Sequence, residues 1–383
     1  MENILNALTE RIRDAAAHHT PVRIQGCGSK DFYGESLQGE VLDTRAYSGI
    51  TSYEPSELVV TVRAGTPLLE LEAALAGRGQ CLAFEPPRFA SPQGLDGGGT
   101  CGGMVAAGLS GPARASVGSI RDYVLGVKLI NGRAEHLTFG GQVMKNVAGY
   151  DVSRLMVGAM GSLGLLTEIS LKVLPVAPAE ATLVFEIDQA RALTQLHHWG
   201  AQPLPLNASC WVRDHTAPNA PELLFVRLRG AVAAVESACT KMLADVPGQR
   251  MDNAQAIGDW AACRDLKLAF FTAPTDAAEP LALWRLSVPQ IAPVLNLPWA
   301  QLVEWHGGQR WLWAPESAMQ QLRQEAASAG GSATIFIAAH AIKERAKGIF
   351  SPLKPAIAQI HQRLKNEFDP VGIFNPGRMY PEF

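Results

Sequence analysis

The sequence lacks the features that would mark a membrane or nucleic-acid-binding protein. No apolar run reaches the roughly 18 residues that a helix needs to span a bilayer, because the longest run, 155–166, is interrupted by glycine. The N-terminus lacks the layout of a signal peptide, and the spacing of Ile4, Leu8 and Ile12 predicts an amphipathic helix there. A net charge of −3 gives no reason to expect nucleic acid or an anionic membrane as a partner. We therefore expect a cytoplasmic protein with no membrane span.

Clustered cysteines are also missing. None of the six cysteines lies within four residues of another: Cys27, Cys81, Cys101, Cys210, Cys239 and Cys263. Iron–sulfur and structural zinc sites need clustered thiolates, so the sequence predicts neither, and no metal site is expected. Buried free thiols in a reducing compartment are the expected state of these residues.

Tryptophan is missing from residues 1–175, which hold 25 of the 36 glycines, whereas residues 176–383 hold all eight tryptophans. Pro175 stands at this change of composition and predicts a boundary. We expect a glycine-rich domain over 1–175, a second domain over 176–350, and a C-terminal helix and tail over 351–383.

Local patterns in the first part predict mixed helices and strands. Thr66 is expected to cap a helix whose apolar face carries three leucines, Leu68, Leu71 and Leu75. The segment "YVLGVKLINGRAEHLTF" predicts a hairpin, and Asn131-Gly132 at its centre suits a type I′ turn. Because strands follow strands here, a regular βαβ parallel sheet is not expected.

In the second part, strands such as "ATLVFEI" and "ELLFVRLRG" alternate with helical stretches. This order predicts an antiparallel sheet with helices on one face. The last helix is marked by apolar residues that share one face at helical spacing, namely Ile357, Ile360, Leu364 and Phe368.

Glycine-rich stretches are the clearest positive signal, although no P-loop pattern is among them. Gly97, Gly99 and Gly102 form a G-x-G-x-x-G, and Asp122 follows 20 residues after the last glycine. A dinucleotide fingerprint of this kind needs a strand directly before it. The preceding stretch is polar and contains Pro92, which argues against that interpretation.

Three other stretches are rich in small residues, and the first two each allow two interpretations. "RIQGCGSK" (23–30) is either a plain tight turn or a nest of backbone N–H groups for a phosphate. The small residues of 101–111 either pack a helix tightly on a sheet or clear space for a flat cofactor. "KNVAGYDVSRLMVGAMGSLG" (145–164) predicts a short helix over 150–156 followed by a glycine turn and a strand.

Taken in order, these stretches resemble the FAD-binding domain of the vanillyl-alcohol oxidase and p-cresol methylhydroxylase (PCMH) superfamily. The likeness covers about residues 20–175. Within that superfamily, "GQCLAFEPPRF", "EWHGGQRWLW" and "FDPVGIFNPGRMYPEF" resemble the family of FAD-binding E subunits of bacterial glycolate oxidase. The resemblance implies an α+β fold, with a PCMH-type FAD-binding domain of two α+β subdomains, an antiparallel-sheet α+β cap domain, and a tail that returns to the FAD domain.

The resemblance also implies a cofactor site. The pyrophosphate would lie on Gly26, Cys27, Gly28 and Ser29, with Lys30 adding positive charge. The isoalloxazine and ribityl side would be lined by Pro86, Thr100, Gly102, Gly103, Ala107 and Gly111. The adenine end would be closed by Gly161, Gly164 and Leu166, with Lys145 and Asn146 nearer the flavin and Asn375 contributed by the tail.

Two departures from the wider superfamily matter. Many of its members hold FAD covalently through a histidine in the first loop, and this chain has none there. We therefore expect non-covalent FAD, with a link to Cys27 as the minor alternative. The related catalytic dehydrogenases also carry an H-x-G-D-G-N-x-H segment that this chain lacks. Arg310 and His340 are the remaining catalytic candidates, against the simpler roles of a stacked arginine and a packed core histidine.

The function implied is that of an FAD-binding subunit in a glycolate oxidase or dehydrogenase complex, which oxidises glycolate to glyoxylate. The chain would be accessory to a catalytic FAD subunit and would work with an iron–sulfur subunit and a small 2-hydroxy acid. The complex would lie in the cytoplasm, free or held at the inner face of the membrane. The alternatives are a self-sufficient FAD-dependent oxidoreductase for another hydroxy acid or alcohol, and a scaffold subunit that has lost the cofactor.

Overall fold

The structure is a computed structural model that describes residues 1–91, 98–141, 151–275, 277–339 and 348–383. The chain divides into two compact units. Unit 1 comprises Met1–Leu109, Ser119–Pro175 and Ile342–Phe383, and unit 2 comprises Ser110–Gly118 and Val176–Ala341. The domain limits drawn from composition stay a prediction. In the described residues, no helix has the length and apolar character needed to cross a membrane.

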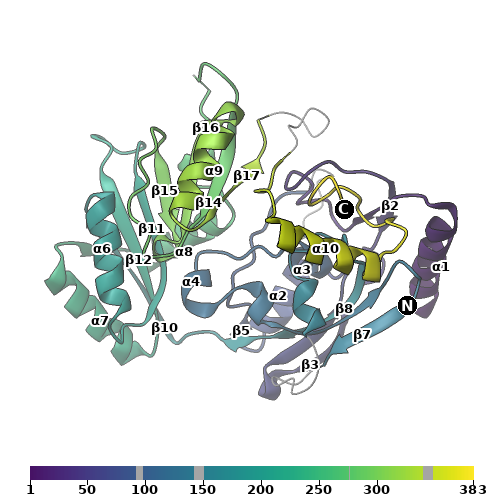
Figure 1. The fold of residues 1–383 in the computed structure, drawn as a ribbon. Helices are drawn as coiled ribbons and strands as arrows, with labels where there is room; N and C mark the ends of the chain where they lie inside the picture. Colours follow the sequence, from purple (N-terminus) through teal and green to yellow (C-terminus); the bar gives the residue numbers. More distant parts are fainter. Residues whose placement is uncertain (92–97, 142–150, 276, 340–347) are drawn as a thin grey trace. The chain divides into compact units, whose positions relative to one another are not determined.

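Unit 1 is built on a five-stranded antiparallel sheet (Figure 1) with the strand order β3-β4-β8-β6-β7. Its strands are β3 (Ile50–Glu54), β4 (Val59–Arg63), β6 (Val124–Ile130), β7 (His136–Gly140) and β8 (Leu165–Lys172). Two smaller pairs accompany it: β1 (Val22–Gln25) lies parallel to β2 (Glu40–Asp43), and β5 (Gln80–Cys81) lies antiparallel to β9 (Leu174–Pro175).

The helices of unit 1 are α1 (Glu2–His18), α2 (Leu68–Ala76), α3 (Cys101–Ala107), α5 (Val152–Leu155) and α10 (Pro355–Phe368). The predicted N-terminal helix is confirmed, because Leu8 and Ile12 of α1 are buried. The apolar face of α2 is also confirmed, and all three of its leucines are fully buried against the sheet. The expected cap is wrong, because the Thr66 hydroxyl bonds the backbone of Gly49 and Arg63 instead.

The predicted hairpin is present as β6 and β7, but its turn is not the expected two-residue type I′ turn. A longer loop, 131–135, joins the strands. The Asn131 Oδ1 atom accepts hydrogen bonds from the backbone N–H groups of Arg133 and Glu135, both at 3.0 Å. The Asn131 side chain thus accepts hydrogen bonds from backbone N–H groups of the loop, so the longer loop is stable without a two-residue turn.

The apolar face predicted for α10 is only partly correct. Phe368 is buried, but Ile357 and Ile360 are 44% and 51% exposed. The buried residue on the inner side is instead Lys365, which no hydrophobic pattern selects. Burial of this ammonium is possible because three oxygen atoms accept its hydrogen bonds, as described below.

Unit 2 contains an eight-stranded antiparallel sheet (Figure 1) with the order β13-β10-β12-β11-β15-β16-β14-β17. The strands are β10 (Ala179–Glu186), β11 (Leu206–Arg213), β12 (Glu222–Gly230), β13 (Gln249–Arg250), β14 (Leu281–Ser287), β15 (Gln301–Glu304), β16 (Gln309–Pro315) and β17 (Ser332–Ile337). The helices are α4 (Arg114–Val117), α6 (Gln189–Gly200), α7 (Val232–Asp245), α8 (Asn253–Arg264) and α9 (Met319–Ser328). The predicted α+β class with an antiparallel second sheet is confirmed.

Helices cover both faces of this sheet, so the prediction of helices on one face is wrong. Leu183 and Phe185 of β10 pack with α6 and α7. Thr182, which alternates with them along the strand, accepts a hydrogen bond of 2.9 Å from the indole of Trp260 on α8. Because successive side chains of a strand point to opposite faces, α8 lies on the face opposite α6 and α7.

Candidate functional site: a glycine-lined cavity in unit 1

A cavity of about 70 Å³ lies inside unit 1, where β1, α3, the loop 156–166 and the C-terminal tail meet. Seven of the predicted cofactor residues line it: Gly26, Gly102, Gly103, Gly161, Gly164, Leu166 and Asn375. Residues from four separate stretches of the sequence thus converge on one space. Its volume is below that of a typical ligand pocket, which fits one end of an extended cofactor rather than the whole of it.

The glycines at this cavity have little room for a side chain. A Cβ atom added at Gly26 would lie 2.4 Å from Oγ1 of Thr100. One added at Gly102 would lie 2.8 Å from Cβ of Ala64. Glycine lets two backbone segments approach each other and any ligand between them. At Gly102 the close neighbour is a protein atom, which supports the tight-packing interpretation of 101–111, while a space cleared for a cofactor stays a prediction.

The loop that follows β1 presents unused hydrogen-bond donors. In the described part of the chain, the backbone N–H groups of Gly26, Cys27, Gly28 and Ser29 donate to no protein acceptor. Gly28 has a φ of 66°, a left-handed conformation that turns the loop back on itself. Consecutive free N–H groups in such a turn form a concave site for an anion. This donor set fits a pyrophosphate.

The N-terminus of α3, by contrast, offers no free donors to a phosphate. Its first three N–H groups all bond within the protein: Cys101 to the Thr66 carbonyl at 2.9 Å, Gly102 to the Ala64 carbonyl at 2.7 Å, and Gly103 to Thr100 Oγ1 at 3.1 Å. The helix N-terminus that a G-x-G-x-x-G fingerprint requires is already satisfied. This contact pattern supports the rejection of the dinucleotide fingerprint.

Lys30 and Cys27 set the electrostatics of the loop. Burial lowers the pKa of Lys30 to about 8, and the neighbouring thiols of Cys27 and Cys101 act in the opposite direction. Burial raises the pKa of Cys27, although Arg45 and Lys30 oppose this. Lys30 is therefore a cation that a bound anion would hold in its charged form, while Cys27 is kept as a neutral thiol.

The far side of the cavity is held by Asn375. Its Oδ1 atom accepts from the backbone N–H of Ile24 at 2.8 Å, and its Nδ2 atom donates to the carbonyl of Met160 at 2.7 Å. Gly161, with a φ of 72°, lies so close that an added Cβ would be 2.7 Å from Asn375 Nδ2. One amide side chain thus joins β1 to the glycine turn.

Several predicted residues lie elsewhere. Pro86, Thr100 and Ala107 do not line the cavity, although Thr100 supports Gly26 from behind. Gly111 belongs to unit 2, where its carbonyl accepts a hydrogen bond of 3.0 Å from the indole of Trp305. The predicted Lys145, Asn146 and His340 lie outside the described residues. The catalytic role of His340 and the cofactor roles of the other residues stay predictions.

Arg310 is fully buried in unit 2 at 0% exposure. Its Nε atom donates to the carbonyl of Gly307 at 2.9 Å, and one terminal nitrogen donates to the carbonyl of Ala292 at 3.2 Å. Burial lowers its pKa to about 10. Arg310 lines neither described cavity. A substrate role for it stays a prediction that these contacts do not support.

Unit 2 has a larger groove of about 1070 Å³ on the α8 face of its sheet. Its walls include the aromatic side chains of Phe225, Trp260, Trp299 and Trp313. The basic residues beside it are engaged, because Arg213 pairs with Glu222 and Arg250 pairs with Glu236. The groove can accept an apolar body, and both of these arginines already have a carboxylate partner.

A strained segment follows β15 in the same unit. Trp305 and His306 have φ angles of 55° and 54°, and Gly307 follows at 100°. The imidazole of His306 lies 3.0 Å from Oγ of Ser209 on one side and 3.0 Å from Oγ of Ser116 on the other. Burial lowers the pKa of His306 to about 4. This histidine is a neutral link between two hydroxyls.

Local sequence patterns missed part of the cavity. Its wall also includes Ile24, Thr44, Ala64, Ala106, Met156, Ala159, Met160, Leu163 and Leu165. Arg378 was missed as well: its guanidinium donates to the carbonyls of Lys30 and Asp31, both at 3.2 Å, and so holds the loop after β1. The only signal that pointed to Arg378 was its position in "NPGR", next to the predicted Asn375.

All six cysteines are free, and five of them are buried, as predicted. Among the described residues, no group of three or more histidine, cysteine or acidic side chains is arranged to hold a metal ion.

Comparisons with known proteins identify the family and the fold of the chain. A family model described as "FAD binding domain" matches residues 5–140. The glycolate oxidase subunit GlcE of Escherichia coli (strain K12) is 44% identical over 378 residues, which cover 98% of this chain and 97% of that protein. The glycolate oxidase subunit GlcD of Bacillus subtilis (strain 168) is 24% identical over 406 residues, which cover 95% and 84%.

Among solved structures, alkyldihydroxyacetonephosphate synthase superimposes with a TM-score of 0.66 at 15% identity, over 96% of this chain and 74% of that one. This likeness shows the fold alone. With the family match, it confirms the predicted PCMH-type fold. The family match and the GlcE relative confirm FAD as the cofactor.

Proposed function

The chain belongs to the family of glycolate oxidase subunit GlcE, and from that premise we propose that it is the FAD-binding subunit of a glycolate oxidase or dehydrogenase complex. The observation that carries the proposal is the glycine-lined cavity of unit 1, with the free backbone N–H groups of 26–29 beside it. When bound there, FAD supplies a two-electron acceptor for the oxidation of a 2-hydroxy acid. The chain itself supplies binding and position.

In this proposal the loop after β1 binds the pyrophosphate. Its four N–H groups donate to the phosphate oxygens, and Lys30 adds a positive charge. Gly161 and Asn375 form the wall at the adenine end. Arg378 supports the loop from behind through the carbonyls of Lys30 and Asp31.

We propose that FAD is held without a covalent bond. A cysteinyl link would require Cys27 to act as a thiolate, and burial raises its pKa. Denaturing the yellow protein in acid tests this, because non-covalent flavin is released into the supernatant. Colour that remains with the precipitated polypeptide would overturn the non-covalent assignment.

We further propose that the chain is accessory to a catalytic FAD subunit and works with an iron–sulfur subunit. The absence of an H-x-G-D-G-N-x-H segment from the sequence supports this division of labour, as does the contact set of Arg310, which is engaged with backbone carbonyls. The free cysteines support a reducing compartment, with the complex in the cytoplasm or at the inner face of the membrane.

Anaerobic mixing of the isolated, FAD-loaded chain with glycolate tests the accessory role. We expect the flavin absorbance to remain unchanged, and we expect it to bleach once the partner flavoprotein is added. Acetate, which has no hydroxyl to oxidise, is the matched control. Rapid bleaching of the isolated chain by glycolate would refute the accessory role.

A second candidate function is a self-sufficient oxidoreductase for another hydroxy acid or alcohol. The observation in its favour is the groove of about 1070 Å³, which gives unit 2 space for a substrate of its own. A screen of 2-hydroxy acids and aryl alcohols against the isolated FAD-loaded chain separates the two functions. Bleaching by one of these compounds, but not by glycolate, would favour this candidate.

A further inference from the structure

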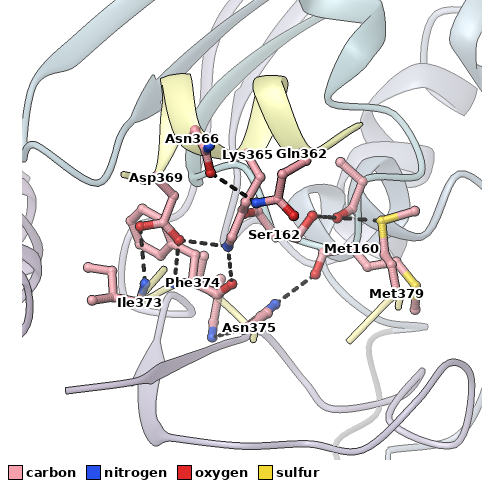
Figure 2. A network of polar contacts seen from close by, with 12 residues as sticks. Met160, Ser162, Gln362, Lys365, Asn366, Asp369, Ile373, Phe374, Asn375 and Met379 are labelled. Atoms are coloured by element: carbon pink, nitrogen blue, oxygen red, sulfur yellow. Dashed lines mark hydrogen bonds and ion pairs between the residues drawn. The ribbon is translucent and has the colours of Figure 1, made fainter. Parts of the chain in front are cut away.

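Lys365 is a lysine whose ammonium group lies inside unit 1 (Figure 2). The residue is only 4% exposed. Its Nζ atom donates to the Ser162 carbonyl at 2.7 Å, to Asp369 Oδ2 at 2.7 Å and to the Phe374 carbonyl at 2.9 Å. An ammonium has three donor hydrogens, so each of them has an acceptor. The buried charge is therefore fully paired and fixed in direction.

Asp369 completes this arrangement from the end of α10. The residue is 1% exposed. Besides Lys365, its carboxylate accepts the backbone N–H of Ile373 at 3.1 Å and that of Phe374 at 2.8 Å. Figure 2 shows these bonds on one side of the ammonium and the bond to Ser162 on the other. One ion pair thus fixes the start of the tail against the loop 160–162.

Neither charged residue lines the cavity, but each anchored segment continues directly into its wall. Ser162 follows Gly161, and Phe374 precedes Asn375; both Gly161 and Asn375 are lining residues. The two segments are also joined to each other, since Asn375 Nδ2 donates to the Met160 carbonyl at 2.7 Å. The spacing between Gly161 and Asn375 is therefore set by Lys365 and Asp369 from behind.

We propose that Lys365 and Asp369 are positioning residues for the adenine half of FAD, which hold the wall formed by Gly161 and Asn375 at the separation that the cofactor needs. This inference rests on the proposed placement of FAD in the cavity. Without the ammonium, the Ser162 and Phe374 carbonyls lose their shared donor, and the two sides of the wall are free to separate. FMN lacks the adenylate half, so its binding does not depend on this wall.

The test is equilibrium binding of FAD and of FMN to the full-length apoprotein, measured by flavin fluorescence. We expect Lys365→Met to weaken FAD binding by about tenfold or more and to leave FMN binding within about twofold. Lys354→Met, the same substitution at an exposed lysine that precedes α10, is the matched control and leaves both affinities unchanged.

A third variant separates this inference from the proposed function. Gly26→Val displaces the loop after β1, because an added Cβ would lie 2.4 Å from Thr100 Oγ1 behind the cavity wall. If Gly26→Val leaves FAD binding intact, the proposed placement of FAD is wrong. If Gly26→Val weakens FAD binding but Lys365→Met does not, or if Lys365→Met weakens FAD and FMN equally, the positioning role alone is overturned.

Asn375→Ala keeps the test decisive if Lys365→Met does not fold. This variant leaves the ion pair intact and removes the bonds to Met160 and Ile24. The same selective loss of FAD over FMN supports the assignment of this wall to the adenine half, on which the positioning role depends. Equal loss of both ligands, or loss of neither, contradicts it.

Discussion

In unit 2, seven of the eight indole N–H groups donate to an acceptor in the same unit, and they belong to Trp199, Trp211, Trp260, Trp284, Trp305, Trp311 and Trp313. In the described part of unit 1, by contrast, four consecutive backbone N–H groups at 26–29 have no protein acceptor. Buried donors are normally paired. The indole donors of unit 2 are thus satisfied within that unit, whereas the loop after β1 in unit 1 leaves four donors open, as the proposed FAD site requires.

The largest expected effect concerns the ion pair between Lys365 and Asp369 in unit 1. We expect Asp369→Ala to destabilise unit 1 by about 3–5 kcal/mol, because it leaves Lys365 buried without its carboxylate. Urea unfolding followed by circular dichroism measures the loss, while tryptophan fluorescence reports on unit 2 alone, since all eight tryptophans lie there. Asp14→Ala, at an exposed pair with His18, is the control and changes stability by less than about 0.5 kcal/mol.

Displacement of the loop after β1 has the next largest expected effect. We expect Gly26→Val to weaken FAD binding by about 100-fold, roughly 2.7 kcal/mol, because an added Cβ would lie 2.4 Å from Thr100 Oγ1. Gly200→Val makes the same change in unit 2, where an added Cβ meets nothing within 4 Å. Fluorescence titration of both variants with FAD checks this. If both variants bound FAD with the same affinity, the assignment of the FAD site to unit 1 would be contradicted.

Lys30 gives the binding a pH dependence. Its pKa in the free protein is about 8 because of burial, and a bound pyrophosphate raises that pKa. Affinity for FAD is then constant below about pH 8 and falls by up to about tenfold per pH unit above it, until the pKa of the bound form is reached. Titrations from pH 6.5 to 10 measure the slope. Lys30→Met should bind FAD more weakly at pH 7 and show no slope; a slope retained in that variant argues against Lys30.

His306 supplies the smallest effect, and it concerns unit 2. Burial lowers its pKa from 6.5 to about 4, so the unfolded chain takes up the proton first as pH falls. Stability linked to this histidine is therefore full above about pH 6.5 and is lost between about pH 6.5 and 4. We expect a loss of about 1 kcal/mol at pH 5, because the side chain is partly exposed. The free energy of unfolding of His306→Gln, measured by tryptophan fluorescence in urea, should lack this pH dependence. The same pH dependence in the variant and in the unsubstituted protein would contradict the role of His306.

Sequence patterns predicted the elements whose burial repeats along one face. The α1 and α2 helices follow from such local spacing. The predictions were wrong where a side chain forms hydrogen bonds other than those of the expected turn or helix cap. Asn131 builds a longer loop through its Oδ1 atom, and Thr66 bonds strand residues in place of capping the helix. Local patterns do not reveal such alternative acceptors.

The cavity shows the same limit at longer range. The glycines of the cavity could be predicted because segments whose backbones approach closely are rich in glycine, and this enrichment is visible in the sequence. Lys365 was missed because its partner Ser162 is 203 residues away in the sequence, and a lysine on an apolar helix normally suggests an exposed side chain. Hydrophobic spacing pointed instead to Ile357 and Ile360, which are exposed. A buried ion pair is a property of the folded chain, and it leaves no periodic signal.

Hydrogen–deuterium exchange of the full chain with and without FAD tests the contrast between the two units most directly. If the open N–H groups and the glycine-lined cavity of unit 1 hold the cofactor, FAD slows exchange in peptides covering 24–31 and 158–166. Peptides along the unit 2 groove, such as 210–216 and 249–252, keep their exchange rates. Protection confined to the unit 2 groove, with none at 24–31, would contradict the assignment of the FAD site.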